Sequence, residues 1–169
     1  MAVYTELKKK DIDVILENYS IGNLEKFEPI EEGVENTNYR ILVNKKKYIL
    51  TIYEKRVDKK DLPFFCSLTT ELFKKKFKCP LPIKNNKNEM ISDYHNKKLT
   101  ILSFIDGVSK KYLSENDSYK VGLETSKLHV LTNNIDLYRK NSLSIDSWVN
   151  IYNEIKLGNK NRDDAKLKF

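Results

Sequence analysis

Cysteine, histidine and glycine are scarce in this chain of 169 residues, which holds two cysteines, two histidines and five glycines. Cys66 and Cys79 belong to no C-x-x-C pair and have no histidine cluster nearby, so the sequence contains neither a zinc motif nor a redox motif. So few cysteines also favour a reducing compartment. These shortages exclude disulfide-rich scaffolds and cysteine-ligated metal domains.

Long apolar runs are missing as well. No stretch approaches the roughly 18 apolar residues that a membrane-spanning helix needs. The N-terminal sequence MAVYTELKKK lacks the apolar core of a signal peptide. We therefore expect a soluble, cytoplasmic protein with no membrane partner.

Arginine is rare in a chain that is nevertheless basic. Only four of its 31 basic residues are arginine, and the formal net charge is +7. Such a charge suggests nucleic-acid binding, but the lysines are scattered among 24 acidic residues. The ten tyrosines are equally scattered, from Tyr4 to Tyr152, rather than set on adjacent strands as a stacking platform. We favour solvated lysines and no nucleic-acid partner; a basic nucleic-acid-binding domain remains an alternative.

A β-hairpin is the clearest local pattern. Apolar and polar residues alternate from Tyr39, a turn is predicted at Asn44 to Lys46, and a second run of strand formers extends from Tyr48 to Tyr53. Gly33 precedes the hairpin in a polar loop, where it can adopt positive φ and let backbone amides approach a ligand. Kinase-like folds cover the phosphates of ATP with such a loop, although a plain turn explains a single glycine equally well.

The remaining patterns predict an α+β fold whose organisation changes at Gly107. Up to residue 106 we expect an antiparallel five-strand sheet with a packed helix, and from 107 to 169 only helices. The last dozen residues lack apolar periodicity and are expected to fray. The predicted helices span 11–19, 61–76, 114–131 and 144–157; the strands span 24–30, the two arms of the hairpin, 89–94 and 99–105; and 79–83 is an extended connector.

Several segments, in this order and spacing, resemble bacterial homoserine kinases of the aminoglycoside-phosphotransferase-like type. They are EGVENTNYRI, YILTIYEKRVDKKDLPFF, CPLPI, ILSFIDG and NSLSIDSW. The resemblance extends from Met1 to about Trp148. It implies a protein-kinase-like N-lobe over residues 1–106, followed by the first helices of a truncated α-helical C-lobe.

The resemblance also implies an activity and a set of ligands. The family transfers the γ-phosphate of ATP, with Mg²⁺, to the side-chain hydroxyl of L-homoserine on the route to threonine. Kinases for choline, methylthioribose or aminoglycosides share the fold, so another acceptor stays open. The nucleotide-binding residues that the resemblance implies form a phosphate loop, the third strand with its exit, and a hinge: Gly33, Val34, Asn36, Thr37, Asn38, Thr51, Lys55, Ser103, Phe104 and Ile105.

Two positions depart from the wider superfamily. Thr51 stands where many relatives carry a phosphate-pairing lysine, and a hydroxyl cannot replace a cation. Either Lys55 or Arg56 reaches the phosphates, or this branch manages without the pair. Glu71 is the one acidic residue in the middle of the 61–76 helix and is the candidate for the usual partner of that lysine.

The kinase template also requires a catalytic aspartate in a His-x-Asp loop and a metal-binding aspartate. In the family both lie beyond the segment around Trp148, so we predict no catalytic and no metal-binding residue here. His129 precedes VLTNN, not a catalytic loop, and His95 is expected at the surface. We expect the N-terminal half of a kinase, from a fragment or a truncated gene, inactive alone and poorly soluble or oligomeric because its last helices present apolar stripes.

Overall fold

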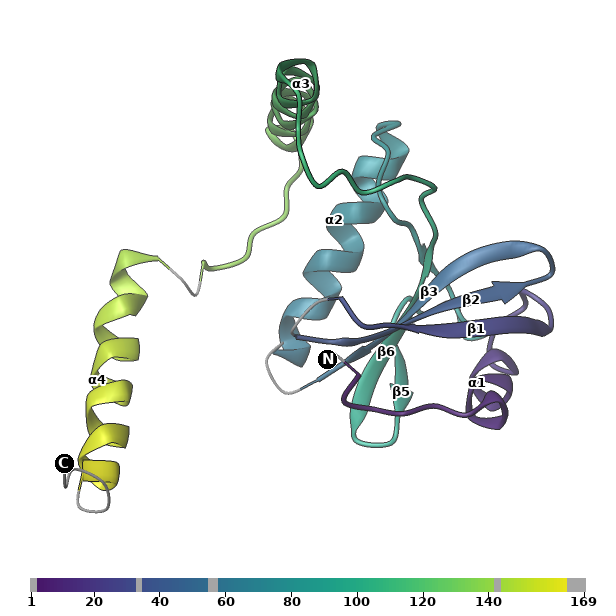
Figure 1. The fold of residues 1–169 in the computed structure, drawn as a ribbon, viewed down its shortest axis with the longest axis horizontal. Coiled ribbons are helices and arrows are strands. Elements are labelled where there is room, and N and C mark those ends of the chain that lie inside the picture. The colour runs from purple at the N-terminus through teal and green to yellow at the C-terminus, as the bar shows by residue number, and fades with distance from the viewer. Residues whose placement is uncertain (1–2, 33–34, 55–57, 142–143, 164–169) are drawn as a thin grey trace. The chain divides into compact units, whose positions relative to one another are not determined.

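The structure, a computed structural model, describes residues 3–32, 35–54, 58–141 and 144–163 (Figure 1). The chain forms two compact units, Met1–Leu137 and Tyr138–Phe169. The helices are α1 (Lys9–Leu16), a 3-10 turn η1 (Lys59–Asp61), α2 (Leu62–Lys74), α3 (Glu115–Thr132) and α4 (Ile145–Asp163). The strands are β1 (Leu24–Ile30), β2 (Thr37–Val43), β3 (Lys46–Tyr53), β4 (Pro82–Ile83), β5 (Ser92–Tyr94) and β6 (Lys97–Ser103).

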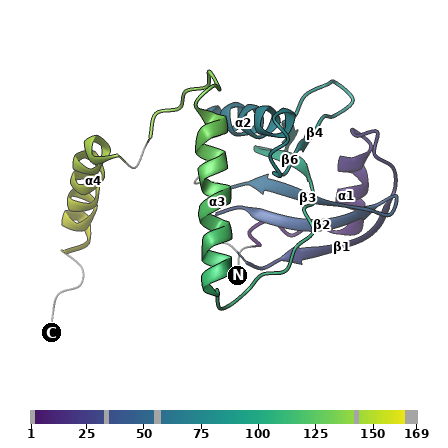
Figure 2. The same ribbon diagram turned by 90° about the horizontal axis from the view of Figure 1, so that it is seen from above.

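The strands form one antiparallel sheet in the order β1-β2-β3-β6-β4, and β5 also pairs with β6. Figure 2 shows β1, β2, β3 and β6 side by side. The predicted count of five strands was wrong, because the connector 79–83 contributes β4, where Pro82 pairs with Leu102. Proline is tolerated there because β4 is an edge strand and needs no N–H on its outer side.

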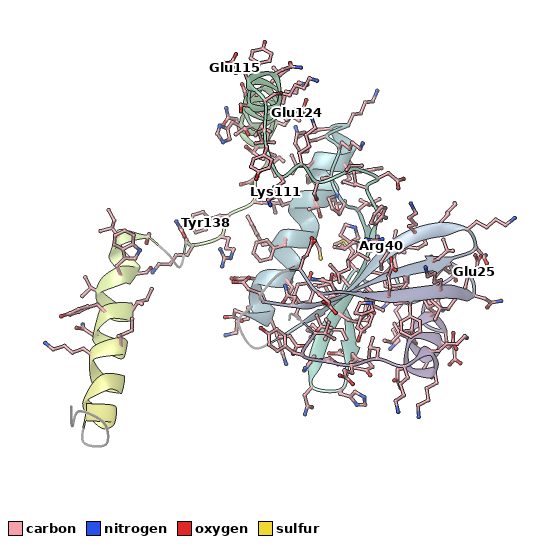
Figure 3. All side chains as sticks on the ribbon, viewed as in Figure 1. Glu25, Arg40, Lys111, Glu115, Glu124 and Tyr138 are labelled. Carbon is pink, nitrogen blue, oxygen red and sulfur yellow. The ribbon has the colours of Figure 1, made fainter. Side chains whose placement is uncertain are left out.

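The hairpin of β2 and β3 closes through a two-residue turn. Asn44 and Lys45 both have positive φ, 45° and 60°, as the type I′ turn that suits a twisted hairpin requires. Glu25, labelled in Figure 3, accepts the backbone N–H of Lys45 at 2.8 Å through Oε1. The predicted turn is therefore confirmed, with β3 beginning at Lys46.

The hydrophobic core lies between α1 and one face of the sheet. Alternate residues of β2 point to this face, and Tyr39, Ile41 and Val43 are all buried. From α1, Ile12, Ile15 and Leu16 pack against them in the same cluster. The helix begins earlier than predicted because Asp11 accepts the backbone N–H of Lys8 at 2.8 Å and caps the first turn.

Helix α2 lies outside that cluster. Its buried residues Leu62, Cys66 and Leu72 are not members of the core formed with α1. On the sheet's second face, the Tyr53 hydroxyl lies 3.3 Å from Thr100 Oγ1, and burial raises the pKa of Tyr53. The sheet thus has one apolar face under α1 and a second face that carries polar side chains.

The two C-terminal helices are largely exposed. Ser114 caps α3, as predicted, by accepting the N–H of Asp117 at 3.2 Å, and none of the residues of α3 is buried. Helix α4 continues to Asp163, so the prediction that residues 158–163 fray was wrong; a helix needs no apolar periodicity to keep its backbone hydrogen bonds, and a glycine such as Gly158 costs only about 1 kcal/mol. Residues 164–169 lie outside the described part. None of the helices, within the described residues, has the length and apolar character needed to cross a bilayer.

Candidate functional site

The second face of the hairpin gathers the polar side chains that the core face excludes. Strand alternation places Asn38 and Arg40 of β2 on this face. Their partners across the ladder to β3 are Thr51 and Ile49. This face of the hairpin therefore carries both polar and apolar side chains, from the first residues of β2 to the hairpin turn.

Asn38 and Thr51 form a cross-strand pair at the loop end of this face. Thr51 Oγ1 donates to Asn38 Oδ1 at 2.8 Å, and Thr51 is only 6% exposed. Because the amide oxygen is the acceptor, the Asn38 Nδ2 group points away from Thr51. Thr51 thus fixes the orientation of the Asn38 amide.

Phe104, which directly follows β6, has two cations next to its ring. Arg40 Cζ lies 5.5 Å and Lys47 Nζ 5.2 Å from the centroid of its ring, within cation–π range. Arg40, labelled in Figure 3, also pairs with Glu28 Oε1 at 2.7 Å. Lys47 pairs with Asp106 Oδ1 at 2.9 Å, and this hydrogen bond lowers the pKa of Asp106. Both cations come from the same face of the hairpin, and their own ion pairs hold them next to the ring.

A shallow hollow of about 290 Å³ lies on the same strands. This volume is at the lower limit for a small-ligand pocket. The hollow is lined by Lys26, Glu28, Arg40, Ile41, Leu42 and Lys47.

Two of the predicted nucleotide-binding residues are turned away from this face. Thr37 is fully buried on the core face, and its hydroxyl donates to Glu54 Oε1 at 2.8 Å. Ser103 is bound to Leu81: its N–H donates to the Leu81 carbonyl and its Oγ accepts the Leu81 N–H, both at 2.8 Å. The predicted donation from the Thr37 side chain to a phosphate, and from the Ser103 N–H to adenine, is not supported by this geometry.

For the other predicted residues, the nucleotide-binding role stays a prediction. Asn36 and Ile105 are half-buried, and Ile105 follows Phe104 beyond the final ladder pair of β6. Glu71 pairs with Lys74 of its own helix at 2.7 Å, not with a residue of β3. Four residues lie outside the described part: Gly33, Val34, Lys55 and Arg56.

The sequence analysis did not identify Arg40, Lys47 and Glu28. The signal was present for Arg40, since it lies two residues from Asn38 and must share its face by strand alternation. Lys47 and Glu28 are brought to this face by the pairing of β3 and β1 with β2, which no local pattern specifies.

The site has the chemistry of a binding surface. An aromatic ring with neighbouring apolar side chains suits a planar base, and oriented amide donors suit phosphate oxygens. Among the described residues no group of three or more histidine, cysteine, aspartate or glutamate side chains could hold a metal ion. We therefore assign no step to a metal held by these residues.

Curated proteins resemble the chain along nearly its whole length. It is 36% identical over 168 residues to a homoserine kinase of Bartonella tribocorum, covering 99% of this chain and 51% of the relative. It is 35% identical to a homoserine kinase of Parvibaculum lavamentivorans, covering 94% and 49%, and 34% identical to one of Agrobacterium fabrum, covering 88% and 46%. The chain spans about half the length of the curated relatives it matches.

A solved structure and a family model agree with this similarity. The microcompartment-associated aminopropanol kinase aligns with a TM-score of 0.63 at 13% identity, covering 83% of this chain and 48% of that chain, which confirms the kinase-like fold of the N-lobe. A family model, described as the phosphotransferase enzyme family, matches residues 26–138. This match covers more than half of the chain, and the chain belongs to the phosphotransferase enzyme family.

Proposed function

We propose that this chain is the nucleotide-binding part of a homoserine kinase, which transfers the γ-phosphate of ATP to the side-chain hydroxyl of L-homoserine. The observation that carries the proposal is the 34–36% identity to homoserine kinases from several organisms over 88–99% of this chain. Residues 1–106 would form the nucleotide lobe and residues 107–169 the beginning of the acceptor lobe. The protein would act in the cytoplasm.

The polar face of β2 and β3 is where we place the nucleotide. Phe104 and the apolar side chains near it would contact the base, and its neighbour Ile105 would offer backbone groups to the edge of the base. Asn38, oriented by Thr51 through the 2.8 Å hydrogen bond, would donate to a phosphate oxygen together with amides of the preceding loop. Phosphoryl transfer depends mainly on such positioning.

Magnesium would arrive with the nucleotide. Mg²⁺ in kinases binds to phosphate oxygens and to only one or two carboxylates. The described residues contain no cluster of carboxylates that could bind Mg²⁺, so we propose no protein ligand for it among them. The chain's own contribution is to hold the base and the phosphates.

Nucleotide binding is tested by titrating the 169-residue chain with ATP and Mg²⁺ in a calorimeter. We expect saturable binding that survives moderate salt. Affinity for RNA or DNA that falls steeply between low and moderate salt, without saturable ATP binding, would instead favour the nucleic-acid alternative.

The acceptor is tested by coupling ADP release to homoserine, choline, methylthioribose and an aminoglycoside in turn. The assay uses two samples: this chain alone, and this chain fused to the C-terminal half of the Bartonella tribocorum relative. Activity restricted to homoserine supports the proposal. A preference for another acceptor contradicts it without affecting the nucleotide assignment.

A further inference from the structure

A half-buried polar network lies on the core face of the sheet, at the end where β2 begins and β3 ends. Its centre is Glu54, which directly follows β3 and whose side chain is only 10% exposed. Glu54 Oε1 accepts hydrogen bonds from Thr5 Oγ1 at 2.6 Å and from Thr37 Oγ1 at 2.8 Å. Glu54 Oε2 pairs with the ammonium of Lys97. One carboxylate therefore receives three hydrogen bonds.

The network joins four segments that are far apart in the sequence. Thr5 lies on the N-terminal segment, Thr37 begins β2, Glu54 ends the β3 arm and Lys97 begins β6. Thr37 Oγ1 also accepts the backbone N–H groups of Tyr4 at 3.0 Å and Thr5 at 3.1 Å, and Lys97 Nζ donates to Thr5 Oγ1 at 2.6 Å. The N-terminal segment is thus tied to the end of the hairpin.

The same network also binds the residues at the C-terminal end of the proposed phosphate loop. The backbone N–H of Glu54 donates to Asn36 Oδ1 at 3.4 Å, and the Glu54 side chain holds Thr37. Asn36 is the last loop residue and Thr37 the first residue of β2, and both directly precede Asn38, whose amide lies on the opposite face and at the candidate site. Whatever fixes Asn36 and Thr37 therefore also fixes the position of Asn38.

The buried polar atoms of the network are already hydrogen-bonded within the protein. No buried side-chain oxygen or nitrogen of the described residues lacks a hydrogen-bond partner. A buried carboxylate is costly unless it is paired and hydrogen-bonded, and an apolar residue could fill the same space without that cost. Glu54 is charged, and its carboxylate is hydrogen-bonded to residues of three other segments. This arrangement points to a role in fixing the positions of the four segments relative to one another.

We propose that Glu54 is a positioning residue for the phosphate-binding loop: its carboxylate locks residues 36–38 to the N-terminal segment and to β6, and thereby sets the affinity for the nucleotide. Glu54 itself does not touch the nucleotide. The effect on nucleotide affinity rests on the proposed function, whereas the locking of residues 36–38 does not.

Glu54→Gln is the test variant. Glutamine retains an oxygen that can accept from Thr5 and Thr37, but it presents an N–H₂ group to the Lys97 ammonium. The matched control is Asp93→Asn, which breaks the ion pair between Asp93 and Lys98, 2.6 Å long, one residue along β6. If Glu54→Gln does not fold, Lys97→Gln replaces it, because it retains a neutral donor beside the Glu54 carboxylate.

The first measurement is amide hydrogen exchange over residues 35–38, without nucleotide. We expect exchange to be about thirtyfold faster in Glu54→Gln, the effect of losing roughly one hydrogen bond to a charged group, and unchanged in Asp93→Asn. Exchange at the hairpin turn, Asn44 and Lys45, stays at the wild-type rate. Unchanged exchange at residues 35–38 in a folded Glu54→Gln or Lys97→Gln variant would overturn the proposal.

The second measurement is the dissociation constant for a fluorescent ATP analogue. We expect up to about thirtyfold weaker binding by Glu54→Gln, the full effect of one charged hydrogen bond, with Asp93→Asn equal to wild type. The double variant Glu54→Gln/Lys97→Gln, which pairs two amides, should recover most of the loss. Faster exchange with unaltered affinity would overturn the link to the nucleotide. A wild-type chain that binds no ATP refutes the proposed function, while the exchange experiment still decides whether Glu54 locks the loop.

Discussion

Thr51 occupies the strand position at which the resemblance predicts a phosphate-pairing lysine in many relatives. A lysine at this position would act as a point charge, whereas the threonine hydroxyl orients Asn38. The sequence analysis identified Thr51 as a departure but not its partner, because the partner lies on the neighbouring strand. In the proposed site, the pair would offer an amide donor of fixed direction in place of a cation.

Thr51→Val is therefore expected to weaken ATP binding without unfolding the protein. Valine has the shape of threonine, so the packing is kept, but the Asn38 Oδ1 atom loses its donor, at a cost of about 1 kcal/mol or roughly fivefold in affinity. Isothermal titration of ATP and Mg²⁺ into the variant measures the change. Thr125→Val on α3 is the control, since Thr125 bonds only to the Val121 carbonyl one helical turn away. Equal affinity of wild type and Thr51→Val would refute the orienting role.

Glu54 should make the stability of the protein sensitive to acid. Burial raises its pKa, but hydrogen bonds from Lys97, Thr5 and Thr37 and the charge of Lys97 outweigh burial and leave the pKa below its ordinary value of 4.5. A depressed folded-state pKa stabilises the fold above 4.5, and this stabilisation is lost as the pH falls through the folded-state value.

Urea unfolding of wild type and Glu54→Gln between pH 7 and pH 3 measures this contribution. At pH 7 we expect the variant to be less stable by about 2 kcal/mol, the order of a hydrogen bond to a charged group. The difference should shrink as the pH falls below 4.5, where the wild-type carboxylate becomes protonated. A difference that stays constant down to pH 3 would contradict the assignment.

The elements show which parts of the fold local patterns determine. The helical period of Ile12, Ile15 and Leu16 and the strand alternation of Tyr39, Ile41 and Val43 were sufficient to predict α1, the hairpin and the core face. The same alternation would have placed Thr37 on the core face, two residues before Tyr39, but it was interpreted as a loop residue. Because Thr37 was assigned to the glycine loop, its place in the strand alternation was overlooked.

Other features were beyond any local pattern. Strand alternation after Leu50 and Ile52 places Glu54 on the core face, but its partners Thr5 and Lys97 lie 49 and 43 residues away in the sequence, and no local pattern identifies them. Likewise β4 forms because Leu81 meets Ser103, 22 residues further along the chain. Long-range pairing of this kind is decided by the tertiary fold, which accounts for the missed strand and the missed network.

The connection between α1 and β1 offers a test at Gly22. Gly22 has a φ of +113°, and a Cβ there would lie 2.2 Å from Asn44 Nδ2 of the hairpin turn. Gly22→Ala should therefore destabilise the protein by at least about 1 kcal/mol, since alanine strains this conformation. Gly122→Ala inside α3, where a Cβ meets nothing within 4 Å, should instead stabilise α3 by about 0.5–1 kcal/mol. Urea unfolding monitored by circular dichroism, which reports on both elements, would contradict the argument if the two variants shifted in the same direction.

Large apolar side chains are exposed on both C-terminal helices. On α3, Tyr119, Val121 and Val130 are 56–71% exposed. On α4, Ile145, Trp148 and Tyr152 are 59–75% exposed. Helices of this length are marginal in water unless an apolar face is covered, and apolar patches of this extent mark an interface or a tendency to aggregate.

We therefore expect the isolated 169-residue chain to self-associate. Size-exclusion chromatography with light scattering at micromolar concentration should give a mass above that of one chain, and the mass should rise with concentration because the association buries apolar side chains. Trp148→Ser combined with Ile155→Ser should shift the distribution toward the monomer, since both residues are exposed on α4. The matched control is Tyr4→Ser, which removes an aromatic side chain that is 58% exposed on the N-terminal segment and should leave the association unchanged. A monodisperse monomer for the unaltered chain would show that the exposed faces of α3 and α4 are tolerated in water.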